Sequence, residues 1–304
     1  MNKQTRAALS AILAAALYAV NVPLSKLLLA HVGPAMMAAL LYLGAGLGLL
    51  AYALLSAAAG KNVVREPLTR RELPYVAAMV ALDVAAPILL MLGIARTASA
   101  NVSLLNNFEI VATSLVALVF FGEVVSKRLW AAIALVTAAS ILLSYEGAGS
   151  LRFGAGSLFV LAACACWGVE NNCTKRLSVK SPVQIVTIKG CFSGLGSLLV
   201  ALLCGESLPA FRWVCAVLLL GFVSYGLSID FYIRAQKDLG AAKTSAFYAV
   251  APFLGAAFSM LLLGERPGPR FYAALLVMAA GTALVLRDTA AQPAQTNARD
   301  AAGR

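Results

Sequence analysis

The sequence predicts an all-α integral membrane protein with ten transmembrane helices arranged as two inverted five-helix repeats. The prediction rests on composition, on the spacing of the apolar segments and on an internal repeat. Of the 304 residues, 61% are hydrophobic and 12% are charged, whereas a soluble domain has about 45–50% apolar and about 25% charged residues. This composition excludes an ordinary soluble protein.

The apolar segments have the length that a bilayer requires. A hydrocarbon core about 30 Å thick needs about 20 apolar residues per helix. The chain divides into ten such segments, at residues 7–30, 35–59, 73–95, 98–121, 129–145, 153–177, 182–204, 213–234, 244–263 and 271–286.

The connections between the segments are short and rich in Gly, Pro and charge. In order along the chain they include HVGPA, GKNVVREPLTRRE, GEVVSKR, GAGSLR, VKSP, GESLPAFR and GERPGPR, and none has room for a soluble domain. The last stretch, RDTAAQPAQTNARDAAGR, is polar and Ala-rich, and we expect a disordered tail over residues 288–304.

The positions of the basic residues predict the orientation. With a cytoplasmic amino terminus, the outside segments hold six basic residues and Lys189 lies within a span, which leaves 17 of the 24 Lys and Arg for the inside. Because basic residues accumulate in cytoplasmic loops, both termini are predicted to be cytoplasmic. The positive charge then reflects topology and contact with anionic lipid, and no nucleic-acid partner is expected.

The two halves of the sequence resemble each other. Gly122-Glu123 near the end of the fourth segment recurs as Gly264-Glu265 near the end of the ninth, and LYAVNVPLSK in the first segment lies over CWGVENNCTK in the sixth. Gly44-x-x-x-Gly48 likewise matches Gly190-x-x-x-Gly194. We therefore predict repeats over residues 1–147 and 148–287. Five spans per repeat turn the second copy upside down, which is typical of transporters with a binding site near the midplane.

These features resemble the drug/metabolite transporter superfamily, EamA type. The resemblance rests on the 5 + 5 spans, on an aromatic residue followed eight positions later by Lys in spans one and six, and on the Gly-Glu pairs. Within the superfamily the chain looks most similar to YddG-type exporters of aromatic and other amino acids. It departs from the usual Trp-Gly in the first span, where Tyr18-Ala19 stands, and this weakens any substrate carried over from that subfamily.

Polar residues at membrane depth are the candidate substrate-binding residues, because a charge at a helix centre costs about 2.5–3.5 kcal/mol on translocon scales. Asn106 and Glu109 share a helical stripe with Thr113, and Trp167, Glu170 and Asn171 share another. Each stripe is predicted to face a central cavity, with an interhelical hydrogen-bonded seam as the alternative. The predicted cavity residues are Tyr18, Asn21, Asp83, Asn106, Glu109, Trp167, Glu170, Asn171, Tyr225 and Tyr248.

Three prolines lie within predicted spans. Pro23, Pro87 and Pro252 each remove a backbone donor, which marks either a kink used in gating or a fixed bend. The six cysteines contain no C-x-x-C, and the chain has one histidine. No cofactor and no metal are therefore expected.

The predicted function is export of small amphipathic metabolites, above all amino acids including aromatic ones, across a bacterial cytoplasmic membrane by alternating access. The expected partners are a small-molecule substrate and membrane lipid. Export of drugs or other metabolites is the alternative within the superfamily, and a passive channel is another. A membrane enzyme acting on a lipid-linked substrate would need an acid/base or nucleophile constellation, and none is apparent with His31 in a loop.

Overall fold

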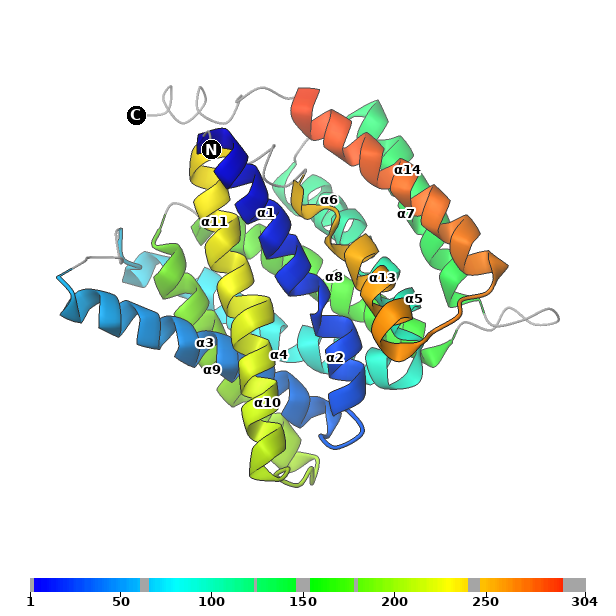
Figure 1. Ribbon diagram of the computed structural model, residues 1–304. Helices are drawn as coiled ribbons and strands as arrows, with labels where there is room; N and C mark the ends of the chain where they lie inside the picture. The colour runs from blue at the N-terminus through cyan, green and yellow to red at the C-terminus, as the bar shows by residue number, and fades with distance from the viewer. Residues whose placement is uncertain are drawn as a thin grey trace.

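The computed structural model describes residues 3–60, 66–122, 125–145, 154–177, 180–239 and 247–291, and the described part is helical throughout its regular elements (Figure 1). Eight helical stretches within it are long and apolar enough to cross a membrane. The chain is therefore a multi-pass all-α membrane protein, as the composition predicts.

The helices of the first half are α1 (Lys3–Ala19), α2 (Asn21–Leu28), α3 (Pro34–Ala58), the 3-10 turn η1 (Arg70–Glu72), α4 (Leu73–Arg96), α5 (Ser99–Leu105), α6 (Phe108–Phe121) and α7 (Lys127–Ser144). Those of the second half are α8 (Ala155–Leu177), α9 (Pro182–Leu203), α10 (Phe211–Gly221), the π-helix η2 (Phe222–Leu227), α11 (Ser228–Leu239), α13 (Ala251–Leu263) and α14 (Pro269–Ala291).

Two of the ten predicted spans are too short or too polar, in the described part of the chain, to be counted with the eight helices that could cross a membrane. The sixth, α8, is long enough, but Glu170, Asn171 and Asn172 lie within it and lower its hydropathy. The ninth, α13, is apolar but short in the described part of the chain, which omits residues 240–246.

The predicted tail, residues 288–304, starts before the last helix ends. Helix α14 continues past the expected boundary at 287 to Ala291. Asp288 is buried there and accepts a hydrogen bond from Ser126, which caps the start of α7. A fixed polar contact at this position explains why the helix does not end with the apolar run. Residues 292–304 of the predicted tail lie outside the described residues.

Glycines in the left-handed conformation end equivalent helices in the two halves. Gly60 (φ 71°) follows α3 and Gly205 (φ 73°) follows α9, while Gly122 (φ 62°) ends α6 and Gly264 (φ 64°) ends α13. Glycine adopts this conformation without a Cβ clash and so terminates a helix cleanly. The Gly-Glu repeat noted in the sequence is therefore a helix-ending signal, although Glu123 itself lies outside the described residues.

Several predicted spans are interrupted near their middle. The fourth breaks at Asn106 and Asn107, where α5 ends and α6 begins, and a turn at Ala249 and Val250 precedes α13. Val20 separates α1 from α2. Discontinuous helices at corresponding positions in two halves are a feature of transporters that bind substrate at the break.

The central crossing is that of α3 with α9, and it depends on glycine. A Cβ on Gly46 would lie 2.5 Å from the Cys191 nitrogen, and one on Gly190 would lie 2.4 Å from the Gly46 nitrogen. Small residues let helix backbones approach this closely, and dispersion contacts then stabilise the pair.

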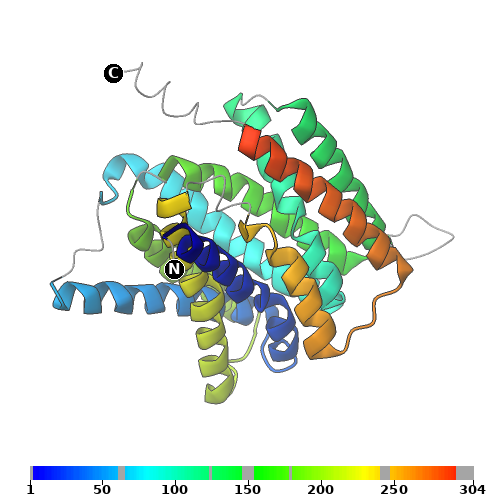
Figure 2. The same ribbon diagram turned by 45° about the horizontal axis from the view of Figure 1, so that its top comes forward.

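Four further pairings follow a reciprocal pattern. Helices α5 and α13 pack together, as do α7 and α14, while α4 packs on α8 and α1 on α11 (Figures 1 and 2). The first two pairs, like α3 with α9, join equivalent helices of the two halves. If each helix is replaced by its equivalent in the other half, the pair α4–α8 becomes α11–α1, and α1–α11 becomes α8–α4. The set of pairings therefore stays the same.

Candidate substrate cavity

A cavity of about 320 Å³ lies between the two halves, at the lower end of the size range of small-molecule sites. The first half contributes Tyr18, Tyr42, Asn106, Asn107, Glu109 and Ile110. The second half contributes Trp167, Glu170, Asn171, Lys189, Ser224, Tyr225, Ile229, Tyr248, Ala249, Ala251 and Pro252. The breaks at Asn106–Asn107 and at Ala249 thus form part of its wall.

Lys189 of α9 organises the charges on one side of this cavity. Its ammonium lies 3.0 Å from the Asp83 carboxylate and 3.1 Å from that of Glu170, which are 0% and 1% exposed. Tyr42 and Trp167 also donate hydrogen bonds to Asp83 Oδ1, at 3.0 and 3.2 Å. Burial of these charges is tolerated because each is paired and hydrogen-bonded.

Glu109 is the cavity carboxylate that Lys189 does not pair. Its Oε1 accepts a hydrogen bond of 2.6 Å from Asn171 Nδ2, which also donates to Thr113 Oγ1 at 3.2 Å. Because the fourth span breaks at Asn107, Glu109 lies in the first turn of α6. The N–H groups of Glu109 and Ile110 donate to the carbonyls of Asn106 and Asn107, and the positive end of the helix dipole favours a carboxylate there.

Tyrosines form another part of the cavity wall. Tyr18 packs edge-on against Tyr225 at 5.8 Å between ring centroids and against Tyr248 at 6.0 Å. Tyr42 lies 5.4 Å from Tyr225, whose hydroxyl accepts a hydrogen bond from Asn21 at 3.2 Å. Tyr225 belongs to the π-helix η2, and π-helical turns recur at functional sites because they re-aim side chains.

The structure brings together eight of the ten predicted cavity residues along the lining: Tyr18, Asn106, Glu109, Trp167, Glu170, Asn171, Tyr225 and Tyr248. Asp83 and Asn21 are buried and do not line the cavity. They lie behind it, where Asp83 holds Trp167 and Tyr42 and Asn21 holds Tyr225.

Sequence reasoning missed other lining residues. Tyr42 carries no charge and shares no polar stripe, so nothing local marked it. Lys189 stood out as an ionisable residue within a span, but its partners come from two other helices. Asn107 lies about 100° round the helix from Asn106 and so outside the predicted stripe, but it lines the cavity and donates to the Leu104 carbonyl at 3.2 Å.

The three prolines occupy different positions. Pro252 lines the cavity in the first turn of α13, and Pro23 lies in the first turn of α2. A missing N–H costs nothing at such positions. Pro87 is buried inside α4, where it has no N–H to donate to the Asp83 carbonyl,.

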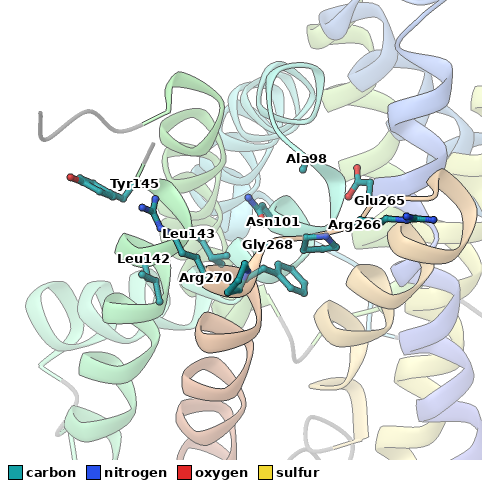
Figure 3. Close-up of a pocket in the computed structure, with 12 residues that line it drawn as sticks. Ala98, Asn101, Leu142, Leu143, Tyr145, Glu265, Arg266, Gly268 and Arg270 are labelled. Atoms are coloured by element: carbon teal, nitrogen blue, oxygen red, sulfur yellow. The ribbon is translucent and has the colours of Figure 1, made fainter. Parts of the chain in front are cut away.

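A second, larger cavity of about 550 Å³ lies at the end of the molecule where α13 turns into α14 (Figure 3). It is lined by Ala98, Asn101, Leu142, Leu143, Tyr145 and residues 265–271. Arg266 and Arg270 are exposed there, and Arg270 lies over the Tyr145 ring. This cavity lacks the buried charges and the tyrosines of the central one, so we place the candidate site in the smaller cavity.

The comparison with known protein families decides what this architecture is. The chain matches the description "EamA-like transporter family" twice, over residues 5–145 and 154–287. The chain belongs to the EamA-like transporter family. Each match covers one half of the molecule, and two matched halves indicate a duplicated repeat. The EamA-like family is a transporter family and not an enzyme family, so the prediction that the protein is no enzyme is confirmed.

Two relatives of this EamA-family protein are informative. An uncharacterized transporter of Methanothermobacter thermautotrophicus is 28% identical over 189 residues, which are 60% of this chain and 55% of the relative. The chain thus spans about half the length of this curated relative. A crystal structure with a TM-score of 0.65 covers 92% of this chain and 96% of its own chain. At 20% identity it shows the fold alone.

Proposed function

We propose that this EamA-family transporter exports small amphipathic metabolites that carry an amine, above all amino acids including aromatic ones, by alternating access. The observation that carries the proposal is Glu109, a cavity carboxylate that accepts its hydrogen bond from the neutral amide of Asn171 rather than from a cation. The sequence resemblance to YddG-type amino acid exporters supports the same substrate class.

Alternating access requires two halves that can rock against each other. Five predicted spans per half would invert the second half relative to the first. The reciprocal helix pairings support that arrangement, because the pairing of α4 with α8 has its counterpart in the pairing of α11 with α1. The cavity at the junction then becomes accessible from either side in turn.

The cavity is suited to an ammonium group beside an aromatic or aliphatic body. Glu109 offers the charge, and Tyr18 and Tyr248 offer ring faces within the same cavity, which attract a cation through their π electrons. Asn106 and Asn107 add amide groups for a substrate carboxylate.

One observation favours a second candidate, an exporter of organic cations or cationic drugs. Lys189 is the single cation among the described lining residues, and it is engaged by both Asp83 and Glu170. Among the described lining residues, a substrate carboxylate would therefore find amides but no unpaired positive charge. A substrate with an amine and no carboxylate matches this charge distribution better than a zwitterion does.

Counterflow into proteoliposomes tests both candidates. Vesicles preloaded with an unlabelled amino acid, an aromatic amine or a quaternary ammonium ion should accumulate the labelled compound of the transported class, with saturation. Glu109→Gln should raise the KM for that compound about ten-fold, because hydrogen bonds to charged groups are the strong ones. Glu72→Gln is the matched control, since Glu72 is half-buried in η1, accepts a hydrogen bond from Thr69 and does not line the cavity.

The outcomes separate the candidates. Amino acid exchange supports the first, exchange of amines alone supports the second, and linear flux without saturation would indicate a channel. If Glu109→Gln leaves the KM of every exchanged compound unchanged, Glu109 is not the amine-binding group.

A further inference from the structure

One end of the molecule is tied together by a glutamate that neither lines the central cavity nor belongs to its charge network. Glu265 follows α13 and turns back to the start of α5, where its two carboxylate oxygens accept hydrogen bonds from the backbone N–H groups of Ser99 and Ala100, each at 2.8 Å. Figure 3 shows Glu265 next to Ala98. Ser99 and Ala100 are fully buried.

The two hydrogen bonds of Glu265 are stronger than hydrogen bonds between neutral groups. The first N–H groups of α5 have no partner within their own helix, and a carboxylate that accepts from two of them forms charge-assisted hydrogen bonds. Gly264 in the left-handed conformation ends α13 and brings Glu265 into position. The contact joins the ninth span to the fourth and therefore joins the two halves.

The packing next to this contact seals the same end. A Cβ on Gly255 of α13 would lie 2.9 Å from Ser103 Oγ of α5 and 3.4 Å from the Ala19 carbonyl oxygen. Ser103 is 2% exposed. At Gly255, α13 therefore packs closely against α5, without room for an added side chain.

The central cavity lies on the other side of this seal. On α13 it is lined by Ala251 and Pro252, at the helix end opposite to Glu265. On the fourth span it is lined from Asn106 onward, beyond Ser99 and Ser103. The lining residues Glu109, Asn171 and Tyr248 are half-buried, whereas Ser99 and Ala100 at the Glu265 contact are fully buried.

We propose that Glu265 is a gate residue: its hydrogen bonds to Ser99 and Ala100 hold this end shut, and they break when the cavity opens toward this end. The inference rests on the proposed alternating access and adds a specific residue to it. Closure depends on a contact between two helices that are both interrupted at the cavity, so a movement at the breaks of α5 and α13 reaches the Glu265 contact directly.

A second glutamate provides the contrast. Glu206 also joins the halves at a helix start, where it accepts hydrogen bonds from the N–H groups of Ala35 and Met36 at 3.1 and 2.7 Å. However, the helix it caps, α3, is locked onto α9 and α10 by backbone contacts at Gly44 and Gly46. We therefore assign Glu206 to stability and Glu265 to gating.

The test uses a reporter cysteine in the seal. Ser103→Cys exchanges a single atom at a buried position, and its alkylation rate in the purified full-length protein can be followed peptide by peptide with mass spectrometry. In this background, Glu265→Ala should speed labelling of residue 103 on the order of ten-fold, because loss of a helix cap shifts the closed state toward the open one. Glu265→Gln, which keeps an acceptor oxygen, should give a smaller increase.

Glu206→Gln is the control and should leave the labelling rate unchanged. If both Glu265 variants are labelled at the same rate as the protein that carries Ser103→Cys alone, the proposal is overturned. An equal acceleration by Glu206→Gln would also overturn it, because that would indicate general loosening of the structure. If Glu265→Ala gives no folded protein, Glu265→Gln alone decides by the same criterion.

The labelling and counterflow measurements fail independently. Faster labelling of residue 103 without any flux of the tested compounds would leave the gate standing and count against the proposed transport of amines. Normal flux with unchanged labelling in the Glu265 variants would overturn the proposed gating role of Glu265 and leave the proposed transport function standing.

Discussion

At the residue scale, the charges in the membrane are ordered by one lysine. Lys189 lies between Asp83 and Glu170, and its side chain is 19% exposed while theirs are nearly inaccessible. A buried charge without its partner is more costly than no charge at all. The two carboxylates therefore depend on Lys189 more than Lys189 depends on either of them.

This asymmetry predicts unequal effects of removing the partners. Lys189→Met should destabilise the protein by about 3–5 kcal/mol, because it leaves two buried carboxylates unpaired. Asp83→Asn should cost less, since Lys189 keeps Glu170 and the amide still accepts from Tyr42. Thermal unfolding in detergent, followed by the loss of the monodisperse peak, measures both. A larger loss for Asp83→Asn than for Lys189→Met would contradict this order.

At the element scale, the α3–α9 crossing is one of the two most extensive contacts between the halves, together with α4–α8. The two helices meet through Gly46 and Gly190 with backbone against backbone, so no side chain buffers a change in volume. Interiors packed in this way respond to a single methyl group.

Gly46→Ala should therefore reduce stability by about 1–3 kcal/mol, the usual cost of overpacking, and lower the folded yield. Gly268→Ala is the control, because nothing lies within 4 Å of its added Cβ and its backbone does not require glycine. The change at Gly268 should stay within about 0.5 kcal/mol. Equal unfolding temperatures for the two variants would show that α3 and α9 can move apart at this crossing without a loss of stability.

At the scale of the whole molecule, two ends can be distinguished. One end holds Glu206 and Glu265 with the helix starts that they bind, and Lys26, whose ammonium caps α4 by donating to the carbonyls of Ile94 and Thr97 at 2.5 and 3.0 Å. The other end holds the Ser126–Asp288 contact between α7 and α14. The distribution of basic residues predicts that the second end is cytoplasmic.

Labelling in intact cells tests this orientation. A cysteine at Lys127 should react with a membrane-impermeant reagent only after the cells are opened, whereas one at Arg212 should react in intact cells, with modification assigned to each residue by mass spectrometry. The expected direction follows from the surplus of Lys and Arg on one side. Reaction of both positions in intact cells would contradict the topology and the inverted arrangement of the halves.

Much of the fold follows from local features of the sequence. Segment length and composition predict a multi-pass helical membrane protein, because the bilayer sets the length of a span. The Gly-Glu repeat marks helix ends, because Gly122 and Gly264 take a backbone conformation that few other residues adopt,. Helical periodicity placed Asn106, Glu109, Trp167 and Asn171 on stripes that the structure directs to one cavity.

Only the tertiary structure decided which residues meet. The contacts of Lys189 join α9 to α4 and α8, and those of Glu265 join the end of α13 to the start of α5. Nothing in the local sequence of either residue specifies such partners, because a pattern of periodicity reports the face of one helix and not the helix opposite. The breaks at Asn106 and Ala249 were missed for the same reason, since the freed backbone groups are tolerated in a membrane only where neighbouring helices or a cavity satisfy them.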